Sequence, residues 1–483
     1  MLRPFKAIRF DWTIIGSVFF LLLTIMAFFR GQWTIVALPV ILIIVLYAFL
    51  KPKYLFFAIV AMTPLSINLE ELGRGEIALY LPTEPLLFGF LIILLLAQLH
   101  SQVIPKEITR HPVSVAFYIY LGWMFITSLT SVQPLVSLKF LISRAWFIVP
   151  IYFAGAAFFL RPRNITRFLL LYLVPFIGVV IYTTIRHASN GFEEDPAHWV
   201  MEPFYRDHTQ YGAVVALFIP ILFGFITRTR QKLEARILGL LALTLLFITL
   251  IYTYSRAALL SVVVAFGFWA MVKSRVSLKL IFGIAAMVGI LLWISFDDIL
   301  LQLQKNRIDS SENLVENVES ITNITTDASN LERINRWNSV FEMTKEKPLF
   351  GFGPGTYMFQ YAPYQKSRDL TIISTNFGDV GNAHSEYLGP LAETGIPGLL
   401  TILYLLYCLF YSAYKAYHRL PDGLPRHFLL FSTMALITYF SHGFLNNFLD
   451  SDKASVPVFG AMAIIVAIDI ISQRPVSNSI NSQ

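Results

Sequence analysis

Apolar stretches of about 20 residues recur along most of the chain, separated by short polar loops. About 20 apolar residues are enough for a helix to cross the hydrocarbon core of a bilayer. Because helices satisfy their own backbone hydrogen bonds in lipid, the pattern predicts an all-α polytopic membrane protein. About 14 spans (12–14) are expected, at 12–29, 33–50, 54–69, 82–99, 113–130, 138–160, 168–185, 211–227, 237–254, 257–272, 278–297, 398–416, 427–446 and 456–472.

One long polar region interrupts this pattern. We expect transmembrane helices 1–11 in residues 1–296, a large, partly helical loop at 297–397, helices 12–14 at 398–473 and a tail at 474–483. Within the loop, residues 310–330 are rich in polar side chains, and a helix is predicted from Leu331 until just before Pro348. Ile334, Trp337 and Phe341 recur at helical spacing, so this face is expected to pack.

Composition agrees with a membrane protein. The chain is 56% hydrophobic and only 14% charged, against about 25% charged residues in soluble proteins. The net charge of +7 comes from basic residues in short loops, so topology explains it better than nucleic acid binding. The single cysteine, Cys408, excludes an internal disulfide and a cysteine metal site. The first apolar stretch lacks a small-residue cleavage pattern, so we expect no cleaved signal peptide.

Loop charges predict the orientation. Alternate loops and termini on one side carry 21 Lys and Arg residues, and the short loops of the other side carry six: Arg30, Arg74, Arg186, Arg206, Arg256 and Lys453. Basic loops stay in the cytoplasm, so both termini are expected inside. The 297–397 loop is then outside, which is the periplasm in a bacterium with two membranes.

Two arginines lie at the predicted outer ends of spans. Arg256 joins the ninth and tenth spans almost without a loop. A guanidinium there is a candidate phosphate ligand, and the alternative is an interface anchor. Arg206 precedes Asp207 and His208 at the start of the eighth span. It is a second candidate ligand, and the alternative is a local ion pair with Asp207.

His384 is a candidate general base. It lies in the outer loop, followed by Ser385, Glu386 and an apolar run, with Gly395 and Gly398 eleven and fourteen residues on. A histidine can accept a proton from a sugar hydroxyl at neutral pH. The alternative is a structural histidine at a helix start. Zinc is not expected, because no His/Glu pair stands near it at ligand spacing.

Other polar groups have simpler interpretations. Lys139, Arg144 and Glu84 lie within or beside spans, and either pair with one another or belong to a lipid-phosphate path. The glycine-rich segment 351–355 is interpreted as a turn that directs the chain, because no strand precedes it and Pro354 interrupts it. The segment 450–452, Asp-Ser-Asp, is interpreted as a solvated turn.

Assembled in order, these residues resemble the O-antigen ligase and O-antigen polymerase superfamily of bacterial membrane glycosyltransferases. The resemblance runs from Arg206 to Gly398. It rests on the Arg206 loop, Tyr-Ser-Arg-Ala at 254–257, Arg336-Trp337 leading to 348–353, and above all His-Ser-Glu-Tyr-Leu at 384–388 with Glu-Thr-Gly-Ile-Pro-Gly at 393–398.

The resemblance implies a GT-C-like fold in the bacterial inner membrane, with the active site facing the periplasm. Such enzymes move a glycan from undecaprenyl diphosphate to an acceptor hydroxyl without a nucleotide, a cofactor or a required metal. It implies that Arg206 and Arg256 hold the diphosphate and that His384 is the base. Further substrate-binding candidates are Arg333, Arg336, His208, Lys139 and Arg144.

Several functions fit this chemistry. We favour O-antigen ligation to lipid A-core in lipopolysaccharide synthesis. A repeat-unit polymerase or a protein O-oligosaccharyltransferase would use the same donor with another acceptor. A flippase is a different class, and it would spread polar groups through the bundle, often in two similar halves. The concentration of polar residues in one outer region disfavours it.

Overall fold

A computed structural model of the protein describes residues 51–69, 79–100, 103–228, 232–274, 328–367 and 381–474, besides a few isolated positions. The predicted spans at 12–29, 33–50 and 278–297, and most of the polar stretch 310–330, lie outside the described residues. The chain divides into two compact units, residues 1–55 and 56–483. Apart from the start of α4, every element below belongs to the larger unit.

Helices dominate the described chain, as predicted. Nine described helices are long and apolar enough to cross a membrane. They are α5 (Thr83–His100), α7 (Pro112–Leu129), the continuous α8–η2–α9 (Pro134–Phe159), α10 (Pro162–Ala188), α12 (His208–Thr227), α13 (Leu233–Tyr252), α14 (Arg256–Lys273), α20 (Leu388–Arg419) and α22 (Asp452–Gln473). The all-α polytopic membrane fold is therefore confirmed.

Shorter elements complete the unit. The more polar α21 (Leu424–His442) packs against α12, α14 and α22, and the predicted span at 54–69 is a short α4 (Pro52–Met62) followed by η1 (Thr63–Leu65). The rest are α6 (Lys106–Thr109), α11 (Glu194–Ala197), α18 (Ala328–Glu346), α19 (Tyr357–Gln360), η3 (Ala362–Tyr364) and the two-stranded pair β1 (Ile67–Asn68) and β2 (Tyr80–Leu81).

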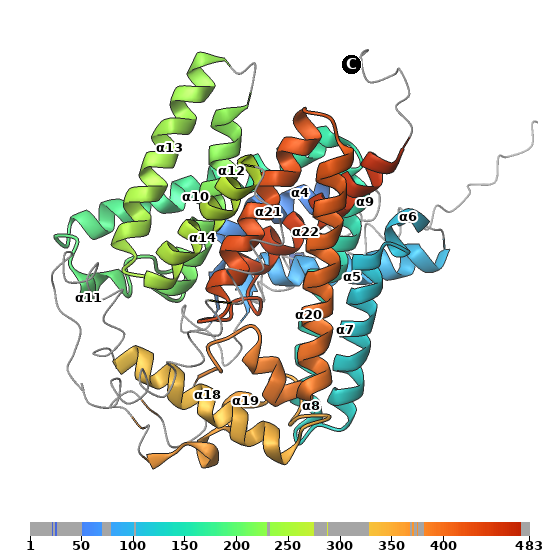
Figure 1. Ribbon diagram of the computed structural model, residues 1–483, viewed down its shortest axis with the longest axis vertical. Coiled ribbons are helices and arrows are strands. Elements are labelled where there is room, and N and C mark those ends of the chain that lie inside the picture. Colours follow the sequence, from blue (N-terminus) through green and yellow to red (C-terminus); the bar gives the residue numbers. More distant parts are fainter. Residues whose placement is uncertain are drawn as a thin grey trace, which may run out of the picture. The chain divides into compact units, whose positions relative to one another are not determined.

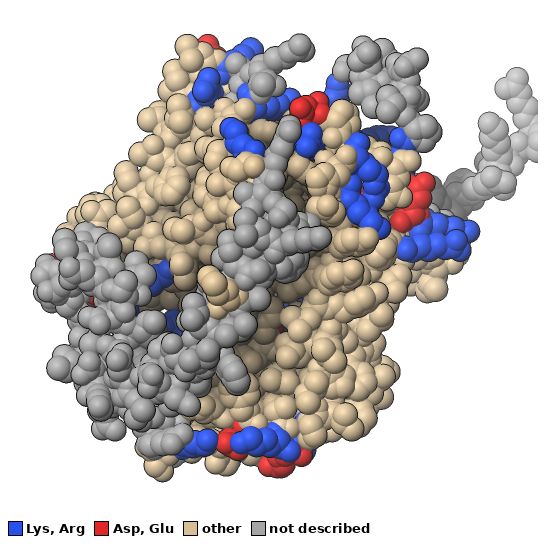
Figure 2. All heavy atoms as spheres, viewed as in Figure 1, with Lys and Arg blue, Asp and Glu red and all other residues tan. Residues whose placement is uncertain are grey.

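The helices share two ends. We call the cap end the one where α12, α14, α20 and α22 begin and where α7, α10 and α21 finish. There α18 and α19 form a cap beside the start of α20 (Figure 1). Between the two ends, Figure 2 shows a broad surface with almost no Lys, Arg, Asp or Glu. Leu96, Val174 and Leu238 are more than half exposed on the helices, as expected of side chains that contact lipid.

A kink at Gly395 divides α20. Gly395 has φ +73°, and a Cβ atom there would lie 2.2 Å from the carbonyl oxygen of Leu349. The next amide, of Ile396, donates to the carbonyl of Pro348 at 2.8 Å. Only glycine permits this backbone approach at positive φ. The residues before the kink therefore pack with the cap, and the long apolar part of α20 follows it.

The glycine-rich segment forms the predicted turn. Gly351, Gly353 and Gly355 all have positive φ. The amides of Phe352 and Gly353 donate to the carbonyls of Ala392 and Glu393, at 3.1 and 2.7 Å. The segment thus binds the cap to the last turn of α20 before its kink.

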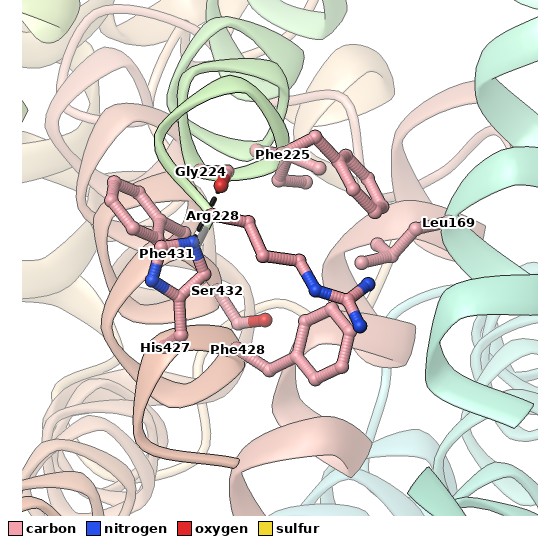
Figure 3. Close-up of a pocket in the computed structure, with 9 residues that line it drawn as sticks. Leu169, Gly224, Phe225, Arg228, His427, Phe428, Phe431 and Ser432 are labelled. Carbon is pink, nitrogen blue, oxygen red and sulfur yellow. Dashed lines mark hydrogen bonds between the residues drawn. The ribbon is translucent and has the colours of Figure 1, made fainter. Parts of the chain in front are cut away.

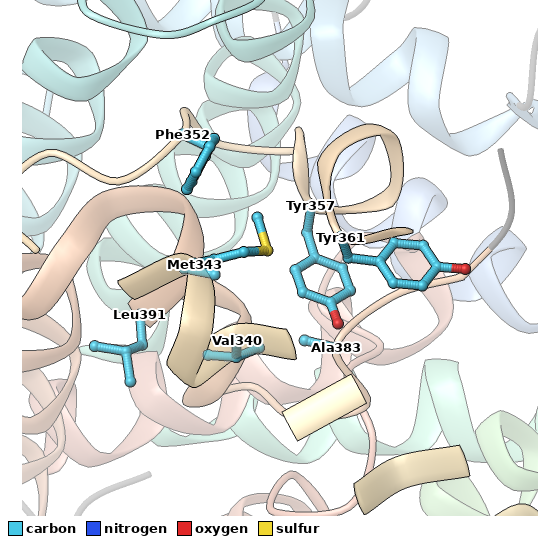
Figure 4. Close-up of a cluster of buried hydrophobic side chains, with 8 residues drawn as sticks. Val340, Met343, Phe352, Tyr357, Tyr361, Ala383 and Leu391 are labelled. Atoms are coloured by element: carbon cyan, nitrogen blue, oxygen red, sulfur yellow. The ribbon is translucent and has the colours of Figure 1, made fainter. Parts of the chain in front are cut away.

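The cap has a hydrophobic core of its own. Figure 4 shows side chains from α18, the glycine-rich segment, α19, the 381–384 turn and the start of α20 meeting there: Val340, Met343, Phe352, Tyr357, Tyr361, Ala383 and Leu391. Ala383 belongs to this core and immediately precedes His384. The core therefore fixes the backbone on one side of the candidate base.

The predicted packing face of α18 is wrong. Phe341 is 46% exposed, and Ile334 and Trp337 are only partly buried. The buried face instead carries Glu332, Asn335, Arg336, Ser339, Val340 and Met343. Its polar groups bond within the cap, as Asn335 does by donating to Gln365 Oε1 at 2.7 Å. Apolar spacing alone does not reveal a buried face whose polar side chains satisfy one another.

The solvated turn predicted at 450–452 is also wrong for two of its three residues. Ser451 and Asp452 are buried, and Asp452 accepts hydrogen bonds from Ser66 and Thr83. Lys453, counted above as a loop cation, is fully buried, and its Nζ donates to the carbonyls of Thr63, Pro64 and Ser66. These partners lie almost 400 residues earlier in the chain.

Candidate functional site

His384 lies in a tight turn just before α20. Its φ of +48° is in the left-handed region, which residues other than glycine adopt uncommonly. Asn382 Oδ1 accepts from the His384 amide at 2.9 Å. Ser385 Oγ accepts from the amides of Tyr387 and Leu388, both at 3.3 Å, and so caps the start of α20. A strained conformation held by neighbours on both sides favours a functional role.

Glu386 ties this turn to the loop between α21 and α22. Its amide donates to the carbonyl of Gly443 at 2.8 Å. Its buried Oε1 accepts from Tyr439 Oη at 2.5 Å and from the amides of Phe448 and Leu449 at 2.8 and 3.1 Å. One carboxylate oxygen thus fixes the position of His384 relative to α21 and the 443–451 loop.

Arg333 brings a positive charge to the same place. It lies on α18, and its Nε donates to the carbonyl of Leu445 at 3.3 Å. The charge of Arg333 acts on three histidines from different elements: His384, His208 and His442. The cap, the start of α12 and the end of α21 therefore meet around this guanidinium.

The protonation state of His384 follows from these surroundings. Burial is the largest cause that lowers its pKa from 6.5 to about 4, followed by the charges of Arg333 and Arg336, against the opposing pull of Glu332 and Asp207. A histidine with a pKa of about 4 is neutral at pH 7. The imidazole is therefore in the form that accepts a proton.

The segment before α12 carries the other predicted polar residues. Asp207 caps α12, because its Oδ1 accepts from the amides of Thr209 and Gln210 at 2.7 and 2.9 Å. Gln210 then donates to Ser451 Oγ at 2.7 Å. Arg206, exposed, and His208 flank this cap. They therefore lie at the cap end, beside the start of α22.

Arg256 is the first residue of α14 and is half-buried. A Cβ on Gly212 would lie 3.2 Å from both Ser255 Cβ and Thr253 Oγ1, so the turn before Arg256 packs directly on the first turns of α12. Arg256 therefore lies at the same end of the bundle as Arg206 and His208.

Packing further along α14 places Arg256 level with the end of α21. Ala265 of α14 packs in one cluster with Phe431 and Met434 of α21. At about 1.5 Å per residue, Arg256 lies about 13 Å from Ala265 towards the cap end, and His442 lies about 12 Å from Met434 in the same direction. The two residues thus reach similar depths.

The two candidate cations of α8 differ. Lys139 is exposed. Arg144 is buried, and its guanidinium donates to the carbonyl of Leu449 at 2.7 Å and to Asp450 Oδ1 at 3.0 Å. Glu84 accepts from the Tyr80 amide instead. Arg144 therefore pairs with Asp450 and supports the 443–451 loop, and not with Glu84, which was one of the alternatives left open above.

Arg336 has structural partners on every side. It is 4% exposed, its Nε donates to Glu332 Oε1 at 2.6 Å, and its guanidinium stacks 4.3 Å from the ring centre of Tyr361. A Cβ on Gly381 would lie 1.9 Å from its Nη1. Of the two neighbouring arginines on α18, Arg333 contacts the loop beside the histidines and Arg336 holds the cap together.

A pocket with about 280 Å³ of empty volume lies at the other end of α12. Leu169, Gly224, Phe225, Phe428 and Phe431 line it, with the guanidinium of Arg228 among them (Figure 3). Gly224 is sixteen residues from His208, about 24 Å along the helix. This pocket is therefore separate from the candidate site around His384 and Arg333.

Comparison with known proteins bears on the function of the residues around His384. Residues 241–403 match the family model described as O-antigen ligase. The match covers about a third of the chain and supports membership of the O-antigen ligase superfamily. The matched residues include Arg256, Arg333, Arg336 and His384, but not Arg206 or His208. No curated protein matches the chain. The family supports a membrane enzyme that transfers glycan from a lipid-linked donor to an acceptor.

Three residues near the His384 turn and Arg333 were not recognised from the sequence: Glu386, His442 and Asn446. Glu386 was noticed only as part of the His-Ser-Glu motif, and its role depends on partners about 60 residues later. His442 and Asn446 stand at the end of an apolar span. The only sequence signal there is a histidine followed by the pair Asn446-Asn447, which is also typical of an ordinary loop.

The buried Arg336–Glu332 pair predicts a stability effect. Arg336→Leu leaves the Glu332 carboxylate buried without its cation, which costs about 3–5 kcal/mol. Adding Glu332→Gln should restore much of this loss. The control is Lys345→Leu on the same helix, which removes an exposed pair with Glu342 and should change stability little. The melting temperatures of the purified proteins test this prediction. Equal values for Arg336→Leu and Lys345→Leu would contradict a stabilising role of the buried Arg336–Glu332 pair.

Proposed function

We propose that this protein transfers a glycan from undecaprenyl diphosphate to an acceptor hydroxyl, most specifically an O-antigen to lipid A-core in lipopolysaccharide synthesis. The observation that carries the proposal is that the His384 turn, through Glu386, and Arg333, through Leu445, both contact the 443–451 loop, at the end of the bundle where α12 follows Arg206 and α14 begins with Arg256. The family match supports the transfer chemistry.

The residues divide the reaction between them. The acceptor oxygen attacks the anomeric carbon of the donor sugar, and the bond from that carbon to the diphosphate oxygen breaks. His384 takes the acceptor proton, and undecaprenyl diphosphate leaves with the bonding electrons. A leaving diphosphate gains negative charge, which positioned guanidinium groups stabilise without reorganisation. Arg206, Arg256 and Arg333 are assigned this task.

Other basic candidates act through the fold. Arg336 positions Glu332, Tyr361 and the 381–384 turn. Arg144 positions the 443–451 loop. Lys139 has no role in this assignment. The proposal thus assigns three cations to the site: Arg206, Arg256 and Arg333.

We assign the cap end to the periplasmic side of the bacterial inner membrane, because the distribution of basic loop residues favours this orientation. Undecaprenyl-linked glycans reach that side after their assembly, and lipid A-core is displayed there too. The proposed donor, the proposed acceptor and His384 then share one face of the membrane.

The acceptor is tested by lipopolysaccharide gels of a deletion strain. For a ligase, all species that carry O-antigen are lost and the core band stays intact, because the donor glycan has no route to the core. Complementation with the wild-type chain restores them. A remaining band with a single repeat unit would instead identify a polymerase, and unaltered lipopolysaccharide with an unmodified protein glycan would identify a protein transferase.

Replacing His384 should stop transfer without loss of donor binding. His384→Asn removes the base but keeps a residue that tolerates positive φ. General-base catalysis contributes roughly 10²–10⁴-fold, so the transfer rate should fall by that factor. Binding of the undecaprenyl-linked donor and the melting temperature should stay near wild type. A stable, donor-binding variant that transfers at close to the wild-type rate would remove His384 from the mechanism.

The lowered pKa of His384 predicts two different acid limits. Without donor, His384 stays neutral down to about pH 4, so kcat/KM should fall only near that pH. Bound diphosphate counters the charge of Arg333, which raises the pKa in the complex. The acid limit of kcat should therefore lie at higher pH than that of kcat/KM. Coincident limits near pH 6.5 would contradict this, provided that melting temperatures show a folded protein throughout.

A further inference from the structure

Two buried polar side chains lie on the loop that faces Arg333. His442 is 2% exposed and Asn446 is 4% exposed. His442 Nε2 and Asn446 Nδ2 have no hydrogen-bond partner among the described residues. Unsatisfied buried polar groups are costly and rare in folded proteins. Two of them within five residues therefore point to a ligand.

Their position relates them to the transfer site. His442 is the last residue of α21, and its carbonyl accepts from the amide of Leu445. The carbonyl of Leu445 in turn accepts from Arg333 Nε at 3.3 Å. Arg333 thus contacts the three-residue turn that separates His442 from Asn446.

The surrounding charges favour an anion. Arg333 and Asp207 both act electrostatically on His442. The Asp207 carboxylate is already engaged as the cap of α12. Arg256 reaches a similar depth on the neighbouring α14. An amide NH₂ group, an imidazole N–H and guanidinium groups are all donors, and together they suit phosphoryl oxygens.

Given the proposed function, we infer that His442 and Asn446 form a second wall of the site and donate hydrogen bonds to the non-bridging oxygens of the lipid diphosphate. Glu386 holds this wall opposite His384, because its carboxylate binds the Phe448 and Leu449 amides while its own backbone belongs to the His384 turn. The diphosphate then lies against the wall beside Arg333, which is bonded to the same turn, and the acceptor enters on the side of His384.

The test measures transfer by the purified full-length protein and its inhibition by undecaprenyl diphosphate. His442→Leu removes one hydrogen-bond donor. Asn446→Asp replaces the other donor with a carboxylate of nearly the same shape, whose negative charge repels the diphosphate. Both should raise the donor KM and the inhibition constant by about 10- to 100-fold, as expected for hydrogen bonds to a charged group. His442→Gln presents an amide N–H near the Nε2 position and should recover most of the affinity.

A buried histidine with a satisfied ring provides the control. His187 is 3% exposed, and its Nε2 bonds to the Glu193 carbonyl at 2.8 Å. His187→Leu should lower the melting temperature and leave the donor KM unchanged. This separates loss of packing from loss of a ligand contact.

Three results would overturn the inference. Wild-type values of the donor KM and the inhibition constant in stable Asn446→Asp and His442→Leu proteins would show that the wall does not bind phosphate. An increase confined to the acceptor KM would assign the two residues to the acceptor. A wild-type protein that undecaprenyl diphosphate does not inhibit would instead refute the proposed donor, and with it this inference.

Discussion

The buried carboxylate of Glu386 is the constraint on which the site depends. A buried carboxylate is tolerated only when its oxygens are bonded, and here one oxygen accepts from a side-chain hydroxyl on α21 and from two backbone amides of the 443–451 loop. The residue two positions earlier is His384. The hydrogen bonds to Glu386 therefore also set how far the candidate base His384 lies from the end of α21 and from the loop that Arg333 contacts.

Contacts from several parts of the chain support the residues around that carboxylate. Arg144 supports the 443–451 loop from α8, Gln210 supports it from α12 through Ser451, and the cap core holds Ala383 from the other side. Each contact comes from a different part of the chain. The result is a candidate base at positive φ whose neighbours are held by several elements, which is the arrangement that transition-state stabilisation by fixed dipoles requires.

The sequence predicted what depends on local pattern. Apolar length is sufficient to predict the long helices of the described residues, because lipid allows few backbone conformations, and α18 ends before Pro348 as expected. Arg256 stands out because a guanidinium at the edge of the hydrocarbon is costly to bury, and His384 stands out because it lies in the outer loop just before an apolar run. The partners of Glu386, the buried polar face of α18 and the burial of Asp452 and Lys453 could not be predicted. Each depends on groups tens to hundreds of residues away in the chain. The periodicity of apolar residues describes only local structure and cannot identify such partners.

The kink at Gly395 has a consequence for how the protein can be divided. The boundary between cap and span looks like a natural joint, since the composition changes there. At the kink, however, the backbone of α20 lies against the carbonyls of Pro348 and Leu349. In a chimera joined at this point, a helix from another protein would have to pack against these two carbonyls without the matching backbone. The unit that can be exchanged between homologues runs instead from the start of α18 past the kink, together with the 443–451 loop. The cap is continuous with the membrane domain in three dimensions, although it is separable in the sequence.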